Sequence, residues 1–543
     1  MAISDDIKAY LKGTFAGLGV NLNDKDLSLT IPEEKEHGDY STNVALRFAK
    51  KLNANPLALA QSLARDVHIA GVAKAEAVKP GFLNFFVTEE ELTDVIGQVI
   101  DKGSAFGNLA YGKGKRVDIE YVSANPTGYL HLGHARGAAI GDSLARIMKK
   151  AGFDVTREYY INDAGNQIDH MAESLIARYL QKLGDPTAKV PDDGYHGQDI
   201  IDIADELVKE VGDKYKADPQ ADLAFFKEYG TAHLMAKIKK DLKRFRVEFD
   251  VFTSEKAVRK SGRIEEALKI LAPKTYRKDN ALFLRTTDDG DDKDRVIIKS
   301  DGSYTYFLPD IAYHWDKFSR GFDLLIDVFG ADHAGYVARL KSAVKSLGYD
   351  PERLQVTLVQ IVRLFKGGVE YKMSKRSGNA VAMNDLIDEV GVDAVRYFFV
   401  ARDGTSHLDF NLDLAKSLSS TNPVYYAQYT HARLNSVLEN GAKYYDGTYV
   451  PALLTNDYEV AVIKALKEYG SRIEEAAETK APYKMALYIQ TLATAANEWY
   501  QHCRVVNDDD IPLTKSRLAL AKAVKTVLAD SLDLIGVSAP EHM

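Results

Sequence analysis

RVDIEYVSANPTGYLHLGHARGAAIGDSLARI, residues 116–147, contains the change of periodicity that decides the fold. In residues 116–123 apolar and acidic side chains alternate, which is the period of a β-strand. Apolar side chains then recur at helical spacing in residues 133–150, and NPTG at 125–128 supplies turn residues between the two patterns. We therefore predict a strand, a loop and a helix in that order.

Three later segments have the pattern of buried strands: residues 155–161, 324–329 and 355–362. Strands that alternate with helices predict an α/β fold with a doubly wound, Rossmann-like parallel sheet. Such a sheet binds its ligand at the carboxyl ends of its strands. Residues 170–300 are charged and mostly helical in pattern, so we expect a helical insertion between the two halves of the sheet.

The flanking segments have different patterns. Residues 1–108 predict an N-terminal α+β domain, and residues 109–405 contain the α/β domain. Residues 406–543 have helical apolar stripes throughout, which predicts an all-α helix bundle. A chain of 543 residues is long enough for two to four such units.

Composition excludes several classes of protein. Hydrophobic residues make up 45% and charged residues 27%, the balance of a soluble globular protein. No apolar run approaches the roughly 20 residues of a membrane span, and the N-terminus has no signal-peptide pattern. The lone Cys503 excludes a disulfide framework and a Cys-rich zinc site. We expect a cytoplasmic protein with no membrane partner and no zinc; the net charge of -8 neither favours nor excludes nucleic acid.

HLGH, residues 131–134, falls where the predicted strand gives way to the helix. A helix start offers free N–H groups and a positive dipole end to a phosphate. His131 and His134 can face that phosphate, and Gly133 lets an adenine ring approach the backbone. Taken alone, two histidines near a helix start are more often incidental.

KMSKR, residues 372–376, follows a later predicted strand. Attack of a carboxylate on ATP builds negative charge on the α-phosphate and the leaving pyrophosphate. Mobile ammonium groups such as Lys372 and Lys375 would stabilise that charge. A solvated basic loop is the simpler reading, but both motifs in this order favour one ATP site for adenylate formation.

HLGH followed by KMSKR resembles the two signatures of class I aminoacyl-tRNA synthetases. Leu132 stands where isoleucine is commoner, and Arg376 replaces the usual final serine. Further stretches resemble arginyl-tRNA synthetases in particular: residues 123–147, HGDYSTNVAL (37–46), YINDAGNQI (160–168), residues 289–314, DAVRYFFVARD (393–403) and the terminal PEHM.

The resemblance implies a ligase that activates L-arginine with ATP and Mg²⁺ and transfers it to the 3′ adenosine of tRNA(Arg). It implies a class I catalytic domain at 109–405 and an anticodon-binding domain at 406–543, and we expect a monomer. Catalytic roles fall on His131, His134, Lys372 and Lys375; ATP binding is expected of these and of Gly133, Met373 and Ser374.

Recognition of arginine requires carboxylates, because a guanidinium group is planar and always charged. The resemblance places Glu120, Ser123, Tyr306 and Asp310 in the arginine pocket, with Asn125 and His134 at the α-amino and carboxylate end. His333 stands where some members carry glutamine. By themselves, acids near strand ends are usually solvated. A ligand role and a loop role are equally open for Asn162, Asp163 and Gln167.

Two candidate tRNA contacts follow. TNPVYYAQYTHARL, residues 421–434, resembles the anticodon-binding domain. Its candidates for unstacked bases and phosphates are Tyr425, Tyr426, Tyr429, His431 and Arg433, of which Tyr425, Tyr429 and Arg433 are preferred. The alternative is that this stripe is core. The N-terminal domain resembles the family's extra tRNA-contacting domain. Asn84 and Phe86 are its candidates, unless their shared strand face points inward.

Three other functions share parts of this sequence pattern. Another class I synthetase is the nearest rival. A cysteinyl enzyme needs zinc thiolates, which the lone Cys503 cannot supply. The isoleucine, leucine and valine enzymes carry a large editing insertion that this sequence lacks. A small-molecule nucleotidyltransferase also uses an HxGH site, but in a much shorter chain. A non-catalytic RNA-binding relative would not need both histidines and both lysines.

Overall fold

The computed structural model describes residues 3–23, 26–30, 32, 35–371 and 381–543. They form two compact units, each built from separated segments. Unit 1 comprises Met1–Phe106, Ser436–Lys467 and Ala495–Thr526, and unit 2 comprises Gly107–Asn435, Glu468–Thr494 and Val527–Met543. None of the helices formed by the described residues combines the length and hydropathy that a membrane crossing requires.

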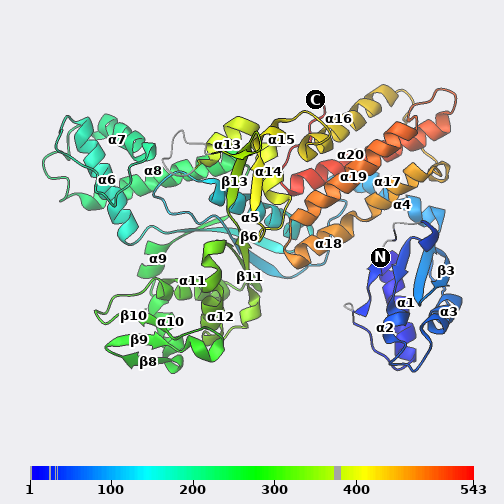
Figure 1. The fold of residues 1–543 in the computed structure, drawn as a ribbon, viewed down its shortest axis with the longest axis horizontal. Helices are drawn as coiled ribbons and strands as arrows, with labels where there is room; N and C mark the ends of the chain where they lie inside the picture. Colours follow the sequence, from blue (N-terminus) through cyan, green and yellow to red (C-terminus); the bar gives the residue numbers. More distant parts are fainter. Residues whose placement is uncertain (1–2, 24–25, 31, 33–34, 372–380) are drawn as a thin grey trace. The chain divides into compact units, whose positions relative to one another are not determined.

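A five-stranded parallel sheet is the centre of unit 2 (Figure 1), with strand order β12-β11-β5-β6-β7. The doubly wound α/β prediction is confirmed, because helices cover both faces. Helix α5 contacts β5, β6 and β11, while α11 and α12 pack around Leu325 of β11. The elements are β5 Arg116–Glu120, α5 Leu132–Lys150, β6 Asp154–Ile161, β7 Val251–Ser254, α11 Phe307–Ser319, β11 Leu324–Gly330, α12 Val337–Ser346 and β12 Leu354–Val359.

Strand β5 is buried on both faces, although its alternating pattern is typical of a half-exposed strand. Val117 and Ile119 are fully buried on one face, and Asp118 and Glu120 are also buried, on the face that α11 covers. The central position of β5 in the sheet places its acids inside the unit. They must therefore find partners there.

The segment 170–300 is less uniformly helical than expected. Strand β7 within it belongs to the main sheet, and residues 275–298 form a separate antiparallel sheet of order β10-β9-β8. Asp279 and Asn280, both at positive φ, form the tight turn between β8 and β9, a hairpin signal present in the sequence. The bounds are α6 Asn166–Lys182, α7 Gln198–Val211, α8 Leu223–Arg244, α9 Glu255–Lys260, α10 Arg263–Leu271, β8 Thr275–Lys278, β9 Ala281–Leu284 and β10 Arg295–Ile298.

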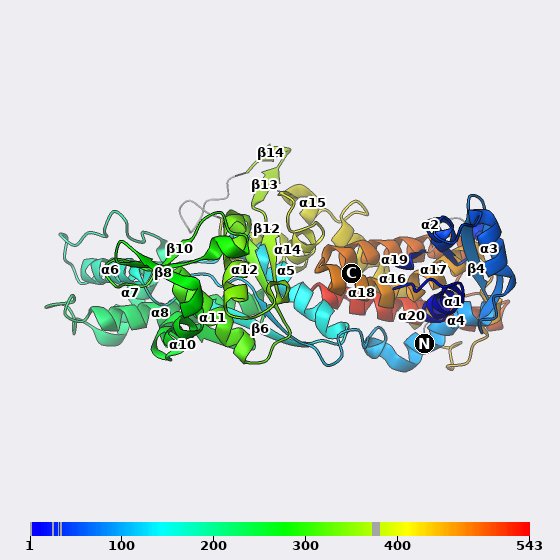
Figure 2. The ribbon, with the colours of Figure 1, turned by 90° about the horizontal axis from the view of Figure 1, so that it is seen from below.

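The strand expected at 355–362 is two strands. β12 ends at Val359, and β13 (Val362–Lys366) pairs with β14 (Val369–Glu370) and β15 (Leu408–Asn411) in a small sheet. Figure 2 shows β13 and β14 at one edge of this unit, next to α15. The nearby helices are α13 Met383–Val390, α14 Val392–Val400 and α15 Leu412–Lys416.

The N-terminal part of unit 1 is an antiparallel sheet of order β1-β2-β4-β3. Ile7, Leu11 and Phe15 of α1 pack against Leu83 and Phe85 of β4, so this part has a core of its own. The bounds are α1 Ile3–Gly17, β1 Leu29–Thr30, β2 Tyr40–Thr42, α2 Val44–Phe48, α3 Pro56–Arg65, β3 Val72–Val78, β4 Phe82–Val87 and α4 Glu89–Lys102.

The all-α prediction for residues 406–543 is wrong at their start, because Leu408–Asn411 form β15 and pair with β13. The rest of the segment is helical as predicted, with α16 Pro423–Gly441, α17 Asp457–Lys467, α18 Tyr469–Thr479, α19 Tyr483–His502 and α20 Ile511–Leu534.

Candidate active site

A cavity of about 950 Å³ lies in unit 2 at the carboxyl ends of β5 and β11, where a parallel sheet binds its ligand. Most of the side chains predicted for ATP and arginine line it: Glu120, Ser123, Asn125, His131, Gly133, His134, Tyr306, Asp310 and His333. Lys372, Met373, Ser374 and Lys375 lie outside the described residues. The cavity thus joins the candidate phosphate site and the candidate guanidinium site.

The HLGH segment forms the start of α5. His131 is the N-cap, and its Nδ1 accepts a 3.1 Å hydrogen bond from the Gly133 N–H. His134 Nδ1 in turn accepts from the His131 N–H at 3.3 Å, and the two rings stack with centroids 3.7 Å apart. With Nδ1 an acceptor in both rings, Nε2 of each neutral imidazole carries the proton. Two N–H donors are therefore available for phosphate oxygens.

Both histidines are neutral at physiological pH. Burial lowers the pKa of His131, and burial together with the neighbouring His131 lowers the pKa of His134 to about 3. A Cβ on Gly133 would lie 3.0 Å from the His131 ring, so this glycine permits the close fold of the cap. The arrangement supplies hydrogen-bond donors rather than positive charge.

The chain that follows the undescribed 372–380 segment is attached to HLGH. The Val381 carbonyl accepts a hydrogen bond from the Leu132 N–H at 3.3 Å, and the Met383 N–H donates to the Leu130 carbonyl at 2.7 Å. Backbone pairing between His131 and Ala382 completes this contact. Residues 381–383 therefore lie directly beside the start of α5.

Glu120 ends β5 and is held from two sides. Its Oε1 accepts from the Ser123 hydroxyl at 2.9 Å, and its Oε2 accepts from Lys317 Nζ at 2.6 Å. Val122 and Ser123 have φ of +69° and +38°. Left-handed backbone is an outlier for a β-branched residue such as Val122, and strain of this kind is maintained only where surrounding contacts enforce it. The turn brings the Ser123 hydroxyl back to Glu120.

Asp310 lies in the first turn of α11, half-buried. Its Oδ2 accepts a 2.6 Å hydrogen bond from the Tyr336 hydroxyl, and its Oδ1 lies 3.1 Å from His314 Nδ1. Tyr306 precedes it by one helical turn and is 71% exposed on the cavity wall. Tyr336 was missed in the sequence because it belongs to another segment, and nothing in its neighbourhood indicates that it reaches Asp310.

The loop after β6 supports the pocket. Asn125 donates to Gln167 Oε1 at 2.5 Å, so Gln167 orients this candidate substrate ligand. Asp163 accepts from the Ser254 hydroxyl at 2.6 Å and from the Lys256 N–H at 2.9 Å, contacts that fasten the start of α9. For Asp163 these contacts favour the loop role. Asn162 lines the cavity, as does His333, whose side chain is 60% exposed.

The candidate tRNA residues Tyr425, Tyr429 and Arg433 of α16 stack on one another. The rings of Tyr425 and Tyr429 stack with centroids 5.7 Å apart, and the guanidinium of Arg433 lies 4.7 Å from the Tyr429 centroid. Tyr429 is 37% exposed, whereas His431 on another face of the helix is buried. The outer side of this stripe is therefore a surface and the inner side is core.

The candidates of the N-terminal sheet differ from each other. Asn84 is only 2% exposed and accepts a 2.7 Å hydrogen bond from the Ser41 hydroxyl, contacts that favour the structural alternative for this residue. Phe86 is half-buried, and Lys74 Nζ lies 4.2 Å from its ring centroid.

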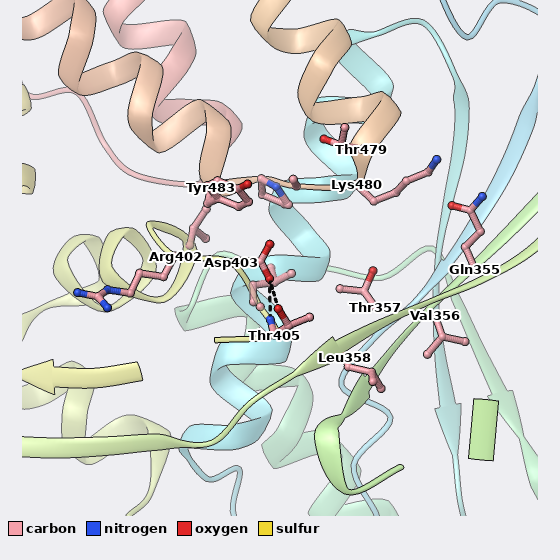
Figure 3. Close-up of a pocket in the computed structure, with 15 residues that line it drawn as sticks. Gln355, Val356, Thr357, Leu358, Arg402, Asp403, Thr405, Thr479, Lys480 and Tyr483 are labelled. Carbon is pink, nitrogen blue, oxygen red and sulfur yellow. Dashed lines mark hydrogen bonds between the residues drawn. The ribbon is translucent and has the colours of Figure 1, made fainter. Parts of the chain in front are cut away.

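A second cavity of unit 2, about 310 Å³, lies between β12, the turn at Arg402–Thr405 and the α18–α19 connection. Figure 3 shows Asp403 accepting hydrogen bonds from Thr405. The two cations of its lining, Arg402 and Lys480, extend in opposite directions in this view. They do not form a common anion site, and none of the residues predicted from the sequence lines this cavity.

Family models match nearly the whole chain. The N-terminal domain of arginyl tRNA synthetases matches residues 1–87, the catalytic domain of class I (R) tRNA synthetases matches 96–438, and the DALR anticodon binding domain matches 427–543. The arrangement is that of one enzyme family along the full chain.

Individual proteins agree with the family models. The chain is 50% identical over 527 residues to the arginine–tRNA ligase of Geobacillus thermodenitrificans, covering 95% of this chain and 94% of that one. It is 48% identical over 538 residues to that of Anoxybacillus flavithermus, covering 97% and 96%. The solved Thermus thermophilus arginyl-tRNA synthetase, 22% identical, has the same fold with a TM-score of 0.78 over 99% of both chains. This chain belongs to the arginyl-tRNA synthetase family of class I.

Proposed function

We propose that this chain activates L-arginine with ATP and transfers the arginyl group to the 3′ adenosine of tRNA(Arg). The observation that carries the proposal is the position of Glu120 and Asp310. Both carboxylates face the same cavity as the HLGH helix start. A cavity with two carboxylates at one end and phosphate-binding donors at the other suits arginine and ATP together.

In the first step an oxygen of the arginine carboxylate attacks the α-phosphorus of ATP, supplied as its Mg²⁺ complex. The new P–O bond forms in line with the bond that breaks, and pyrophosphate leaves. Nε2–H of His131 and His134 donate to phosphate oxygens, and Gly133 leaves room for the nucleotide. Lys372 and Lys375 neutralise the charge that develops on the leaving group, with Met373 and Ser374 in the same ATP-binding segment.

The pocket aligns the substrate. Glu120 and Asp310 accept hydrogen bonds from the guanidinium, Tyr306 covers it, and Ser123 fixes Glu120. Asn125 holds the α-amino and carboxylate end together with His134, whose single Nε2–H is shared between the α-phosphate and the attacking carboxylate, and His333 lies at the rim. Correct placement of both reactants supplies much of the rate, so no covalent intermediate on the protein is required.

In the second step the 2′-hydroxyl of the terminal adenosine attacks the arginyl carbonyl, and AMP leaves. We propose that tRNA(Arg) is held by a C-terminal domain at 406–543, through Tyr425, Tyr429 and Arg433, and by an N-terminal domain at 1–108. The stack of Tyr425, Tyr429 and Arg433 on α16 supports the first contact. For the second contact, half-buried Phe86 is a better candidate than Asn84. The enzyme would act as a cytoplasmic monomer.

Arginine-dependent exchange of pyrophosphate into ATP tests the proposal, measured with and without tRNA against a panel of amino acids. We expect exchange with arginine alone among the panel, and only when tRNA is present. Exchange supported by another amino acid, or none with arginine and tRNA together, would overturn it. Asp310→Ala should weaken arginine binding while ATP binding stays nearly unchanged.

A further inference from the structure

Three acidic side chains form a row beneath the candidate arginine pocket. Strand register pairs Asp327 of β11 with Glu120 of β5, and Glu120 with Glu158 of β6. The carboxylate row, as we call these three residues, crosses three neighbouring strands, and none of them is more than 6% exposed. Only Glu120 lines the cavity. The other two have no evident contact with a substrate.

Helix α11 places two cations over the row. Lys317, fully buried, lies with its Nζ 2.6 Å from Glu120 Oε2 and 3.1 Å from Asp327 Oδ1. His314, less than one turn earlier, lies with Nε2 2.8 Å from Asp327 Oδ2. Its Nδ1 lies 2.8 Å from the main-chain carbonyl of Asp310 and 3.1 Å from Asp310 Oδ1. Asp327 therefore uses one oxygen for each of the two cations. Each cation in turn holds one of the two pocket carboxylates.

The cluster is closed at its other end by Arg320, whose Nη2 lies 2.7 Å from Glu158 Oε2. Glu158 also accepts hydrogen bonds from the hydroxyls of Tyr313 at 3.0 Å and Thr253 at 2.6 Å. The pKa of Glu158 is lowered to about 2, because Lys317, the neighbouring Asp118 carboxyl, Arg320 and the Thr253 hydroxyl together outweigh its burial. Glu158 is therefore an anion.

His314 is a cation, because the carboxylates on both sides of its ring raise its pKa well above the usual value in spite of burial. Asp327 is an anion, its pKa lowered to about 2 because Lys317 and His314 together outweigh burial. Burial raises the pKa of Glu120 overall, with Asp327 adding to the shift and Lys317 opposing it. Both of its carboxylate oxygens accept hydrogen bonds, from the Ser123 hydroxyl and from Lys317 at 2.6 Å, and this geometry makes it the anionic partner of Lys317.

Asp118 is the exception. Asp118 lies two residues before Glu120 on β5, and its Oδ1 is 3.4 Å from Lys317 Nζ. Neither of its oxygens accepts a hydrogen bond from a described donor. Burial raises its pKa to about 8, with Glu158 adding to the shift and Lys317 and Arg320 opposing it. At neutral pH Asp118 is a neutral acid and adds no charge to the cluster.

The cluster consequently carries one negative charge in excess. Next to Asp327, three anions face two cations, and one bound guanidinium balances the count. The anions are Glu120, Asp310 and Asp327, and the cations are His314 and Lys317. At the other end of the cluster, Glu158 and Asp316 are balanced by Arg320 and Arg263.

We propose that Asp327 is a positioning residue for arginine: through Lys317 and His314 it sets the places of Glu120 and Asp310 and leaves the pocket one positive charge short. The inference rests on the proposed function of this cavity and adds a reason why the pocket selects a charged side chain over a neutral one. A side chain of the same shape without the charge leaves a buried anion unbalanced, which is expensive. Citrulline, in which a neutral ureido group replaces the guanidinium, is such a side chain.

Asp327→Asn tests the rule because it removes one charge and little volume. We expect the dissociation constant of arginine, measured by calorimetry at pH 7, to rise about 10- to 100-fold, the range for loss of a charged hydrogen-bond partner. The dissociation constant of citrulline should stay the same or fall, so discrimination between the two ligands drops. ATP affinity and the melting temperature report whether the site as a whole is intact.

Asp118→Asn is the matched control: the same change, equally buried, on the neighbouring strand. It should alter arginine affinity at pH 7 less than about twofold, because Asp118 is already neutral. His314→Gln breaks the same connection from the side of Asp310 but removes a cation, so discrimination by charge should not drop. Arginine affinity should fall because Asp310 loses its position, and this variant tests the positioning role if Asp327→Asn does not fold.

A double variant separates charge from packing. Lys317→Met alone removes a cation and the partner of Glu120, so arginine affinity should fall. Asp327→Asn combined with Lys317→Met restores the single excess charge, and the double variant should bind arginine better than the two single losses predict. A purely structural role predicts losses that add or worsen.

Two results would overturn the inference: unchanged discrimination between arginine and citrulline in Asp327→Asn together with unchanged arginine affinity in His314→Gln, or additive losses in the double variant. Failure of the proposed function looks different, because then the unaltered enzyme itself shows no arginine-dependent exchange in the presence of tRNA.

Discussion

The hydroxyl of Tyr336 donates a 2.6 Å hydrogen bond to Oδ2 of Asp310, so a residue of the segment after β11 fixes a carboxylate of α11. Tyr336→Phe removes this donor and leaves the ring. We expect the KM for arginine to rise about tenfold, the usual effect of one hydrogen bond to a charged group, with kcat little changed.

Steady-state aminoacylation checks this expectation. Tyr349→Phe is the control, since Tyr349 stacks on Phe318 outside the cavity. An equal rise of KM in both variants would show that the Tyr336 hydroxyl has no special role.

His134 should remain neutral across the physiological pH range. Its pKa is lowered to about 3 by burial and by His131, so its imidazole nitrogens should give no titration between pH 8 and pH 5 in a heteronuclear NMR experiment on the free enzyme. His134→Asn assigns the signals. A titration with a midpoint near 6.5 would show that the site is more hydrated than its geometry indicates.

Asp118 should make the protein less stable as pH rises. Its pKa is raised to about 8 in the folded protein, whereas an unfolded aspartate releases its proton near pH 4. Between these values the folded state holds the extra proton, so stability is full below pH 4 and declines towards pH 8. The slope is about 1 kcal/mol per pH unit.

Denaturant midpoints of the unaltered protein and of Asp118→Asn, compared at pH 5.5 and pH 7.5, measure this effect. The variant should gain stability relative to the unaltered protein at the higher pH. Asp327→Asn serves as the contrast. Asp327 has a lowered pKa and is ionised at pH 5.5 and at pH 7.5, so the stability lost in this variant should be the same at both pH values. A parallel response of the two variants would contradict the assignment.

Arg433 should contribute to tRNA binding through its charge and its stacking on Tyr429. Arg433→Gln should weaken binding of tRNA and reduce the slope of log affinity against log salt by about one. Arginine and ATP affinities should not change. Filter binding at several salt concentrations checks this, with Arg472→Gln, an arginine of α18 paired with Glu468, as the control. Equal slopes for the two variants would remove Arg433 from the tRNA surface.

The sequence alone determined the local parts of this protein. Alternation in residues 116–123, helical spacing in 133–150 and the turn between them predicted β5, α5 and the loop that joins them. The position of HLGH at a helix start followed from the same periodicity. These features depend on neighbours within a few residues, and side-chain period reports such neighbours directly.

Tertiary structure decided what lies far apart in the chain. The sequence did not reveal that β7 completes the main sheet within a segment expected to be helical, or that Asn84 is buried and accepts a hydrogen bond from the Ser41 hydroxyl. Nor did it place Asp327 in register with Glu120 or bring Lys317 between them. Periodicity assigns a residue to a face of its own strand, whereas the packing of distant segments determines which residue stands opposite it. For that reason the candidate phosphate site could be predicted from the sequence, whereas the charge balance of the candidate arginine pocket emerged only from the fold.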